Sequence, residues 1–321
     1  MKKYLCLSIF CILISCKNEP KELQISSGKI NSISIIIEDE FWNGEIGDSI
    51  RNKFAAPVIG LPQEEPIFTI NQFPIKLLEG FMTNSRNIIV VKKSPKSEFE
   101  ITENEYATPQ NVVHISGKSV LEILDTLDCN AGNIIDKIKA LEILELQKNT
   151  KKSLINAKKV NTKFNITIEI PKNYKYVMRR SKFIWLKKEI SSGSLSLLAY
   201  QVPISTIQSN KQRLNQVIKT QDSIGNLYIH GSAINTQMMT DNNFLPYFAN
   251  VKIDNKPAFE TKGLWQMNND FMSGPFINYN IIDQKNNRIL VLEGFCYAPS
   301  KEKRDLMFEL ESIMKSIKFR I

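Results

Sequence analysis

The densest group of candidate binding residues lies within residues 263–279, GLWQMNNDFMSGPFINY. The alternation before this group predicts a strand and the Asn-Asn-Asp step predicts a turn, so core packing accounts for most of the apolar side chains. It does not account for an indole, two amides, a carboxylate and a thioether placed so close together. We therefore take five residues as candidate binding residues: Trp265, Asn268, Asn269, Asp270 and Met272.

A second candidate is the basic and aromatic stretch of residues 171–188, PKNYKYVMRRSKFIWLKK. Such mixtures bind nucleic-acid strands, or the anionic groups of glycans and lipids, through charge and stacking. The alternative is a β-hairpin that carries basic side chains at its turn and on its outer face. Arg179 and Arg180 form the centre of the stretch and are its candidate binding residues.

Four carboxylates surround Trp42 in residues 36–45, IIEDEFWNGE. Neighbouring acids raise one another's pKa and can serve acid–base chemistry, which would suit an envelope hydrolase acting on glycan or peptidoglycan. The alternative is a solvated strand end. The four residues are Glu38, Asp39, Glu40 and Glu45.

Other common chemistries lack their residues in this sequence. There are two histidines, and neither has a second ligand at a metal-binding spacing, so we expect no zinc site. Asn268 to Asp270 lack the alternate oxygen ligands of a calcium loop. We find no G-x-S-x-G elbow and no Gly-rich phosphate loop, so we predict no catalytic residue, no metal and no cofactor.

The N-terminus resembles an export signal peptide followed by a cysteine to which a lipid anchor is attached. Two lysines precede an unbroken run of apolar and small residues from Tyr4 to Ile14, too short to span a bilayer as a helix. The run ends in Leu13-Ile14-Ser15-Cys16, which resembles the lipobox of bacterial lipoproteins. The alternative is a secretory signal with an incidental cysteine. The resemblance implies a signal peptide over residues 1–15 and lipid attachment to Cys16.

A lipid anchor would hold the mature protein on a membrane, because two or more acyl chains bind stably. Residues 16–31 would form a polar tether, and Lys17 after the cysteine favours the outer membrane. The net charge of +9 does not by itself indicate a polyanion, because lysine is abundant along the whole chain. A protein in the cell envelope meets little nucleic acid. We expect an envelope protein or an anionic glycan or lipid as the partner.

Periodicity predicts an α+β fold with an antiparallel sheet packed with helices, in two domains. The N-terminal α+β domain covers residues 32–160, with strands near 32–38, 86–92 and 111–116 and two helices near 116–128 and 130–146. The C-terminal antiparallel α+β domain covers residues 161–321. It has a helix within 205–225 that ends at Gly225, and a last helix that Ser300 caps. Whether Cys129 and Cys296 are paired stays open.

Four stretches resemble an uncharacterised envelope lipoprotein family, the domain of unknown function DUF4837, over nearly the whole mature chain. The stretches are GLPQEEPIF, SRNIIVV, GLWQMNNDFMSGPFINY and NRILVLEGFCYAPSKEKRDLMFELESIMKSIKF. In outline the second half is also similar to the PsbP-like fold. The resemblance implies a lipid-anchored protein without an assigned activity. The residues that match the family pattern are Pro62, Glu65, Pro66, Arg86, Asn87, Trp265, Asp270, Gly274, Pro275, Arg288, Glu293, Gly294 and Pro299.

Together these features predict a lipid-anchored envelope protein that acts as a non-catalytic binding or interaction module. An envelope hydrolase that uses carboxylates is the alternative. The biochemical activity, the partner, the membrane leaflet and the oligomeric state are not readable from the sequence.

Overall fold

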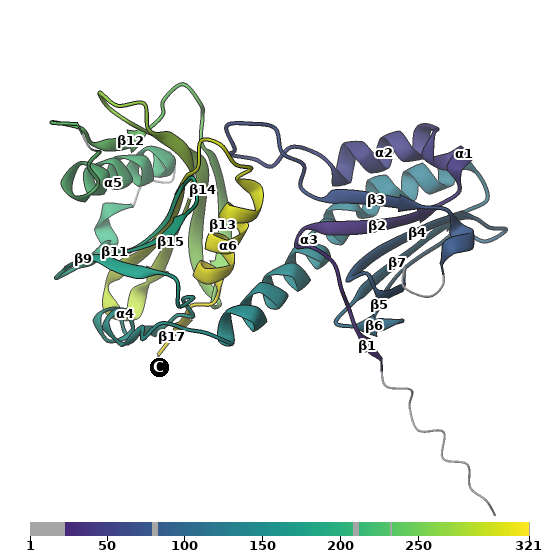
Figure 1. The fold of residues 1–321 in the computed structure, drawn as a ribbon, viewed down its shortest axis with the longest axis horizontal. Helices are drawn as coiled ribbons and strands as arrows, with labels where there is room; N and C mark the ends of the chain where they lie inside the picture. The colour runs from purple at the N-terminus through teal and green to yellow at the C-terminus, as the bar shows by residue number, and fades with distance from the viewer. Residues whose placement is uncertain (1–22, 79–82, 208–211, 232, 321) are drawn as a thin grey trace, which may run out of the picture.

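The computed structural model describes residues 23–78, 83–207, 212–231 and 233–320 of the chain. The predicted signal peptide and Cys16 lie outside the described residues. Two sheets form two lobes that lie side by side (Figure 1). We call residues 23–151 the N-lobe and residues 153–320 the C-lobe.

The N-lobe holds a five-stranded sheet in the order β3-β2-β4-β7-β5. Its first four strands run parallel, and only β5 at the edge is antiparallel. A second, two-stranded pairing joins β1 to β6. The strands are β1 (Gln24–Ile25), β2 (Ser32–Ile37), β3 (Thr69–Phe73), β4 (Asn87–Lys93), β5 (Glu98–Glu103), β6 (Ala107–Thr108) and β7 (Asn111–Gly117).

Helices cover one face of this sheet. Side chains of α2 and α3 pack on alternate residues of β2, β4 and β7 and form one core cluster. The opposite face has a smaller apolar cluster under η1 and the residues around it. The helical elements of the N-lobe are α1 (Asp39–Trp42), α2 (Glu45–Phe54), η1 (Ile75–Leu77) and α3 (Val120–Lys151).

Helix α3 is continuous, so the prediction of two helices separated near residue 129 is wrong. Ser119 caps its first turn by accepting a hydrogen bond from Glu122 N at 3.3 Å. Leu127, Ala131 and Ile134 keep helical spacing across the predicted break and are all buried. This uninterrupted apolar stripe outweighs the local turn tendency of the residues between its members. In the described part of the chain, no helix is long and apolar enough to cross a bilayer.

The C-lobe holds an eight-stranded antiparallel sheet in the order β12-β14-β15-β16-β11-β10-β9, with β13 paired to β14. The predicted α+β class with an antiparallel sheet packed with helices is confirmed. Its strands are β9 (Lys175–Arg180), β10 (Phe183–Ile190), β11 (Gly193–Pro203), β12 (Met238–Thr240), β13 (Tyr247–Ile253), β14 (Lys256–Met267), β15 (Ser273–Asp283) and β16 (Arg288–Tyr297). Outside this sheet, β8 (Ile166–Thr167) pairs with β17 (Lys318–Phe319).

Helices lie on both faces of the C-lobe sheet (Figure 1). Helices α4 and α6 belong to the core cluster on one face, and α5 belongs to the cluster on the other. The helical elements are α4 (Lys158–Phe164), η3 (Ile204–Thr206), α5 (Arg213–Tyr228), η4 (Gln284–Asn286) and α6 (Arg304–Lys315).

Gly225 does not end α5, contrary to the prediction, because the helix continues to Tyr228. The glycine instead permits a close approach to β12. A Cβ atom at this position would lie 2.3 Å from Met238 O. Glycine is required at this position because a side chain would collide with β12, and not because the helix ends there.

Helix α6 joins the lobes because its sides meet different partners. Leu310 and Ile313 enter the core on the C-lobe sheet. On another side, α3 approaches, and Gln147 Nε2 donates to Ser312 O at 3.0 Å. The helix is therefore part of both lobes' packing.

The first turn of α6 is capped by a side chain from the N-lobe. Glu65 is buried in the segment between α2 and β3, which reaches across to α6 (Figure 1). Its carboxylate accepts hydrogen bonds from Lys303 N at 2.7 and 2.9 Å and from Arg304 N at 2.7 Å. A negative charge at this position also favours the helix dipole. The prediction that Ser300 caps this helix is wrong, because Ser300 lies in the preceding turn.

We expect Glu65→Ala to lower the free energy of unfolding by about 1–3 kcal/mol, since it leaves the buried N–H of Lys303 and the partly buried N–H of Arg304 without an acceptor. Glu64→Ala is the matched control, because Glu64 is exposed and should change stability by less than about 0.5 kcal/mol. Denaturant unfolding of both variants measures the difference. Equal stability of the two variants would show that the cap does not hold the lobes together.

Candidate functional site

An open groove lies between α4 and β9 on the C-lobe. It encloses about 960 Å³ and is lined by four basic side chains, two tyrosines and no carboxylate. The lining residues are Ile155, Asn156, Lys158, Lys159, Thr162, Lys163, Tyr174, Tyr176 and Arg179. Lys158, Lys159 and Lys163 belong to α4, and Lys159 and Lys163, four residues apart, lie on the same side of the helix.

A β-bulge determines which arginine enters the groove. The pairing of β9 with β10 shifts register at Trp185/Leu186, so that Val177 has no partner. Tyr176 and Arg179 consequently lie on the same face of the sheet. Arg180 is paired with Phe183, which belongs to the core cluster on the opposite face. The two predicted binding residues are therefore separated, and only Arg179 lines the groove.

Tyr176 organises the charges on its side of the groove. The Lys159 ammonium lies 5.7 Å and the Arg179 guanidinium 5.8 Å from the centre of its ring. Its hydroxyl donates to Asn156 O at 3.2 Å, which fixes the ring. Lys163 Nζ is partly used by the β9–β10 turn, since it donates to Arg180 O at 2.8 Å.

The groove therefore presents several cations without a carboxylate to neutralise them. Such a surface attracts anions, and the attraction weakens as salt screens it. The partly exposed ring of Tyr176 adds apolar contact area, whereas Tyr174 is buried in the core. This geometry suits a ligand with repeated negative charges.

The structure places Trp265 in the core rather than at a surface. Its side chain is 1% exposed, its ring packs edge-on against Phe295 at 5.4 Å, and Nε1 donates to Cys296 O at 3.2 Å. Gly274 allows this contact, because a Cβ atom there would lie 2.0 Å from Cys296 O. The packing of its ring in the core explains why a tryptophan is found at position 265.

The other candidates around it form the β14–β15 turn. Asn268 Oδ1 accepts from Gln237 N at 2.6 Å, and Asn269 adopts a left-handed φ of 56°. Asp270 Oδ1 accepts from Phe271 N at 2.7 Å. Met272 is partly buried against the core cluster under α5. These contacts give Asn268, Asn269 and Met272 roles in the turn, and the predicted binding role stays a prediction.

The carboxylates around Trp42 lie on the surface. Glu38, Asp39 and Glu40 are exposed at the start of α1, and Asp39 Oδ1 accepts from Gln72 Nε2 at 3.1 Å. The face of Trp42 is covered by the Arg51 guanidinium at 4.5 Å. This arrangement fits the solvated strand end that the sequence left as an alternative.

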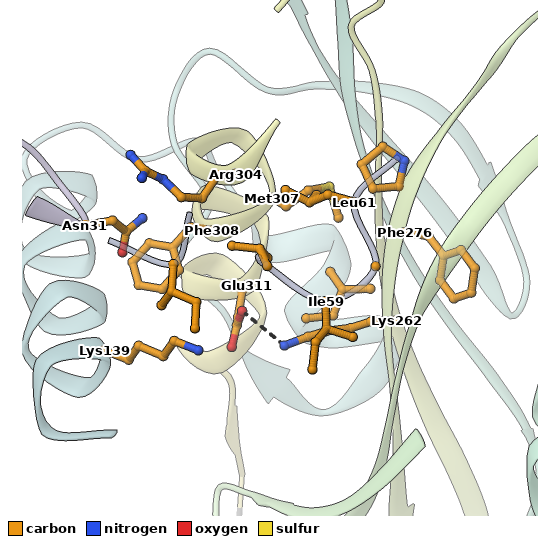
Figure 2. A pocket seen from close by; sticks show the side chains of 15 residues that line it. Asn31, Ile59, Leu61, Lys139, Lys262, Phe276, Arg304, Met307, Phe308 and Glu311 are labelled. Carbon is orange, nitrogen blue, oxygen red and sulfur yellow. Dashed lines mark ion pairs between the residues drawn. The ribbon is translucent and has the colours of Figure 1, made fainter. Parts of the chain in front are cut away.

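A second hollow lies between the lobes (Figure 2). Its enclosed part measures about 60 Å³, or about 540 Å³ with the space at its mouth. The segment between α2 and β3 forms one wall, and α6 and the C-lobe sheet form others. Its charged lining residues are Lys139 from α3, Lys262 from β14, and Arg304 and Glu311 from α6.

Glu311 is the electrostatic centre of this cavity. Lys315 Nζ lies 2.6 Å from Oε1 and Lys262 Nζ lies 3.7 Å from Oε2. Burial alone would raise the pKa of Glu311, but these cations outweigh it and lower the pKa to about 2. Burial, together with the nearby charge of Lys262, lowers the pKa of Lys139. None of these residues was singled out from the sequence, because the cavity brings together elements far apart in the chain.

Another buried acid, Glu293, lies beneath α5. Glu293 Oε2 accepts from Tyr200 OH at 3.1 Å and from Asn278 Nδ2 at 3.3 Å. Burial raises the pKa of Glu293 to about 8, so the carboxyl group holds its proton at neutral pH. As an uncharged core acid it can accept the Tyr200 hydrogen bond without the cost of a buried charge.

Cys129 and Cys296 are free thiols, the first exposed and the second buried. Among the residues with described positions, no group of three or more His, Cys, Asp or Glu side chains could hold a metal ion.

The fold and the groove define a two-lobed α+β protein with a surface suited to anions. The chain belongs to the family of the domain of unknown function DUF4837, whose model matches residues 153–316. Residues 26–151 match a different model, the domain of unknown function DUF8532. The predicted family is thus confirmed for the second half of the chain, while the first half matches its own model. No curated protein matches the chain.

Proposed function

We propose that this protein is a lipid-anchored envelope protein that binds an anionic glycan or lipid head group in the α4–β9 groove. The observation that carries this proposal is the composition of the groove lining. Four cations meet two tyrosines there, and none of the lining residues is a carboxylate. The protein acts as a binding module, with no chemical step assigned to it.

The charges of the groove suit a repeating anion better than a single one. Lys158, Lys159 and Arg179 are exposed, so each can approach a separate negative group. An exposed ion pair contributes little by itself, typically less than about 1 kcal/mol. Useful affinity then requires several pairs at once, as a polymer or a cluster of head groups provides.

The anchor rests on the sequence Leu13-Ile14-Ser15-Cys16 and its resemblance to a lipobox. The second part of the predicted tether of residues 16–31 overlaps β1, in which Gln24 pairs with Ala107 of β6. Gln24 follows Cys16 by eight positions, and a fully extended chain of that length would reach at most about 30 Å. A lipid on Cys16 would therefore keep the lobes close to the membrane.

The groove is tested by two variants one residue apart. We expect Arg179→Gln to weaken binding of dextran sulfate by the purified protein about two- to fivefold, and to reduce the salt dependence of that binding. Arg180→Gln removes the same charge from the opposite face and should have a much smaller effect. Fluorescence anisotropy with labelled dextran sulfate at several salt concentrations measures both.

Neutral dextran is the ligand control and should not bind. Vesicles with and without phosphatidylglycerol distinguish a lipid head group from a glycan as the source of the negative charge. Equal affinities and equal salt slopes for Arg179→Gln and Arg180→Gln would refute the groove as the binding site.

The anchor is tested separately. We expect Cys16→Ala to abolish lipid attachment and to move the protein from the membrane fraction of cells to a soluble or unprocessed form. Mass spectrometry of the N-terminal peptide and cell fractionation check this. Retention of an acylated N-terminal peptide in the variant would contradict the assignment of Cys16.

A further inference from the structure

We propose that the cavity between the lobes binds a small amphipathic acid, an apolar molecule that carries one carboxylate. The inference does not depend on the groove, which lies on another part of the C-lobe. It rests on the walls of the cavity and on one lysine whose charge is not matched.

The walls of the cavity are predominantly apolar and come from both lobes (Figure 2). Ile59 and Leu61 contribute from the N-lobe segment, and Phe276, Met307 and Phe308 contribute from the C-lobe. Small-molecule sites commonly have this composition, with a few polar groups that orient the ligand, and they often lie between domains. An apolar body of the ligand would be buried against these side chains.

The ion pairs in and beside the cavity leave one of its lysines, Lys139, without a carboxylate partner among the described residues. Glu311 is already bound by Lys315 at 2.6 Å, and Lys262 is shared between Glu311 and Glu260, whose Oε1 lies 3.2 Å away. Lys139 points toward the same space in Figure 2, yet its ammonium has no ion pair or hydrogen bond with any residue that the structure describes. A carboxylate placed beside it would form the missing pair.

The hydrogen bonds of Tyr279 explain why Glu311 and Glu260 are not free to take this role. The Tyr279 hydroxyl lies 2.8 Å from Glu260 Oε1 and 3.3 Å from Glu311 Oε1. Both carboxylates are thereby held toward β14 and β15. Swinging either of them to Lys139 would break contacts that hold it in place.

The size of the cavity limits the ligand. The enclosed part of about 60 Å³ is well below the range of about 300–1,000 Å³ that is usual for small-molecule sites, so only part of the ligand would be enclosed and the rest would lie in the open mouth. One unmatched ammonium fits a monoanion, whereas a phosphate dianion would need a second cation. A narrow aliphatic acid whose chain extends into the mouth fits this space and this charge.

Octanoate is the probe, with octanol and octylamine as uncharged and cationic analogues of the same length. Isothermal titration calorimetry with the full mature chain should show binding of octanoate, at least tenfold weaker binding of octanol, and none of octylamine. Failure of octanoate to bind, or equal binding of octanoate and octanol, would overturn the inference.

Lys139→Gln should weaken octanoate binding at least tenfold and leave octanol binding unchanged. The matched control is Lys148→Gln on the same helix, where the exposed lysine forms a surface pair with Glu145. Octanoate affinity unchanged in Lys139→Gln would overturn the inference.

A second variant covers the case in which Lys139→Gln does not fold. Ile59 is 58% exposed at the cavity, so Ile59→Trp should fill the mouth with little effect on the core. It should block octanoate and octanol alike. Unchanged binding of octanoate to Ile59→Trp would place the ligand elsewhere.

Discussion

The capping of α6 by Glu65 is the contact on which the relation between the two lobes depends. The carboxylate of one lobe accepts the first backbone hydrogen-bond donors of a helix that belongs to the core of the other. Arg304 strengthens the junction by donating to Pro66 O at 3.1 Å. Because α6 also packs against α3, it is held from three directions, and the cavity is the space left beside it.

Several residues predicted to belong to the DUF4837 pattern now have structural explanations, and two of them, Arg86 and Asn87, lie instead in the part of the chain that matches the DUF8532 model. Arg86 and Asn87 donate to the fully buried Glu142 of α3, with distances of 2.8 Å and 2.6 Å to Oε1. Arg288 pairs with Asp283 at 2.8 Å across the β15–β16 turn. These buried charges are paired and hydrogen-bonded, as the cost of removing a charge from water requires. They fix the fold and do not indicate a ligand.

The alternation before residue 268 predicted the strand that forms β14, because this strand is long and its partner β15 follows directly in the chain. Sequence patterns did not predict the continuity of α3, where tertiary packing outweighed local turn chemistry. They also could not predict that Glu65 would cap a helix more than two hundred residues away. Contacts of this kind depend on how the lobes meet, which periodicity does not describe.

The sequence also did not predict how neighbouring residues of the candidate site are arranged. The basic stretch around Arg179 was predicted from its composition, but the bulge at Val177, which places Arg179 rather than Arg180 on the face of Tyr176, left no sequence signal. The lysines of α4 were interpreted as part of a domain boundary, although they form the other side of the groove. Trp265 was predicted to bind because it stands close to polar turn residues in the sequence, but its side chain is buried in the core.

The groove as an anion-binding surface is tested most directly by hydrogen–deuterium exchange of the full mature chain with and without dextran sulfate. Binding in the groove should slow exchange in residues 158–163 of α4 and 175–180 of β9, and this protection should disappear at high salt. Protection confined to the β14–β15 turn, or to any region away from α4 and β9, would contradict the assignment.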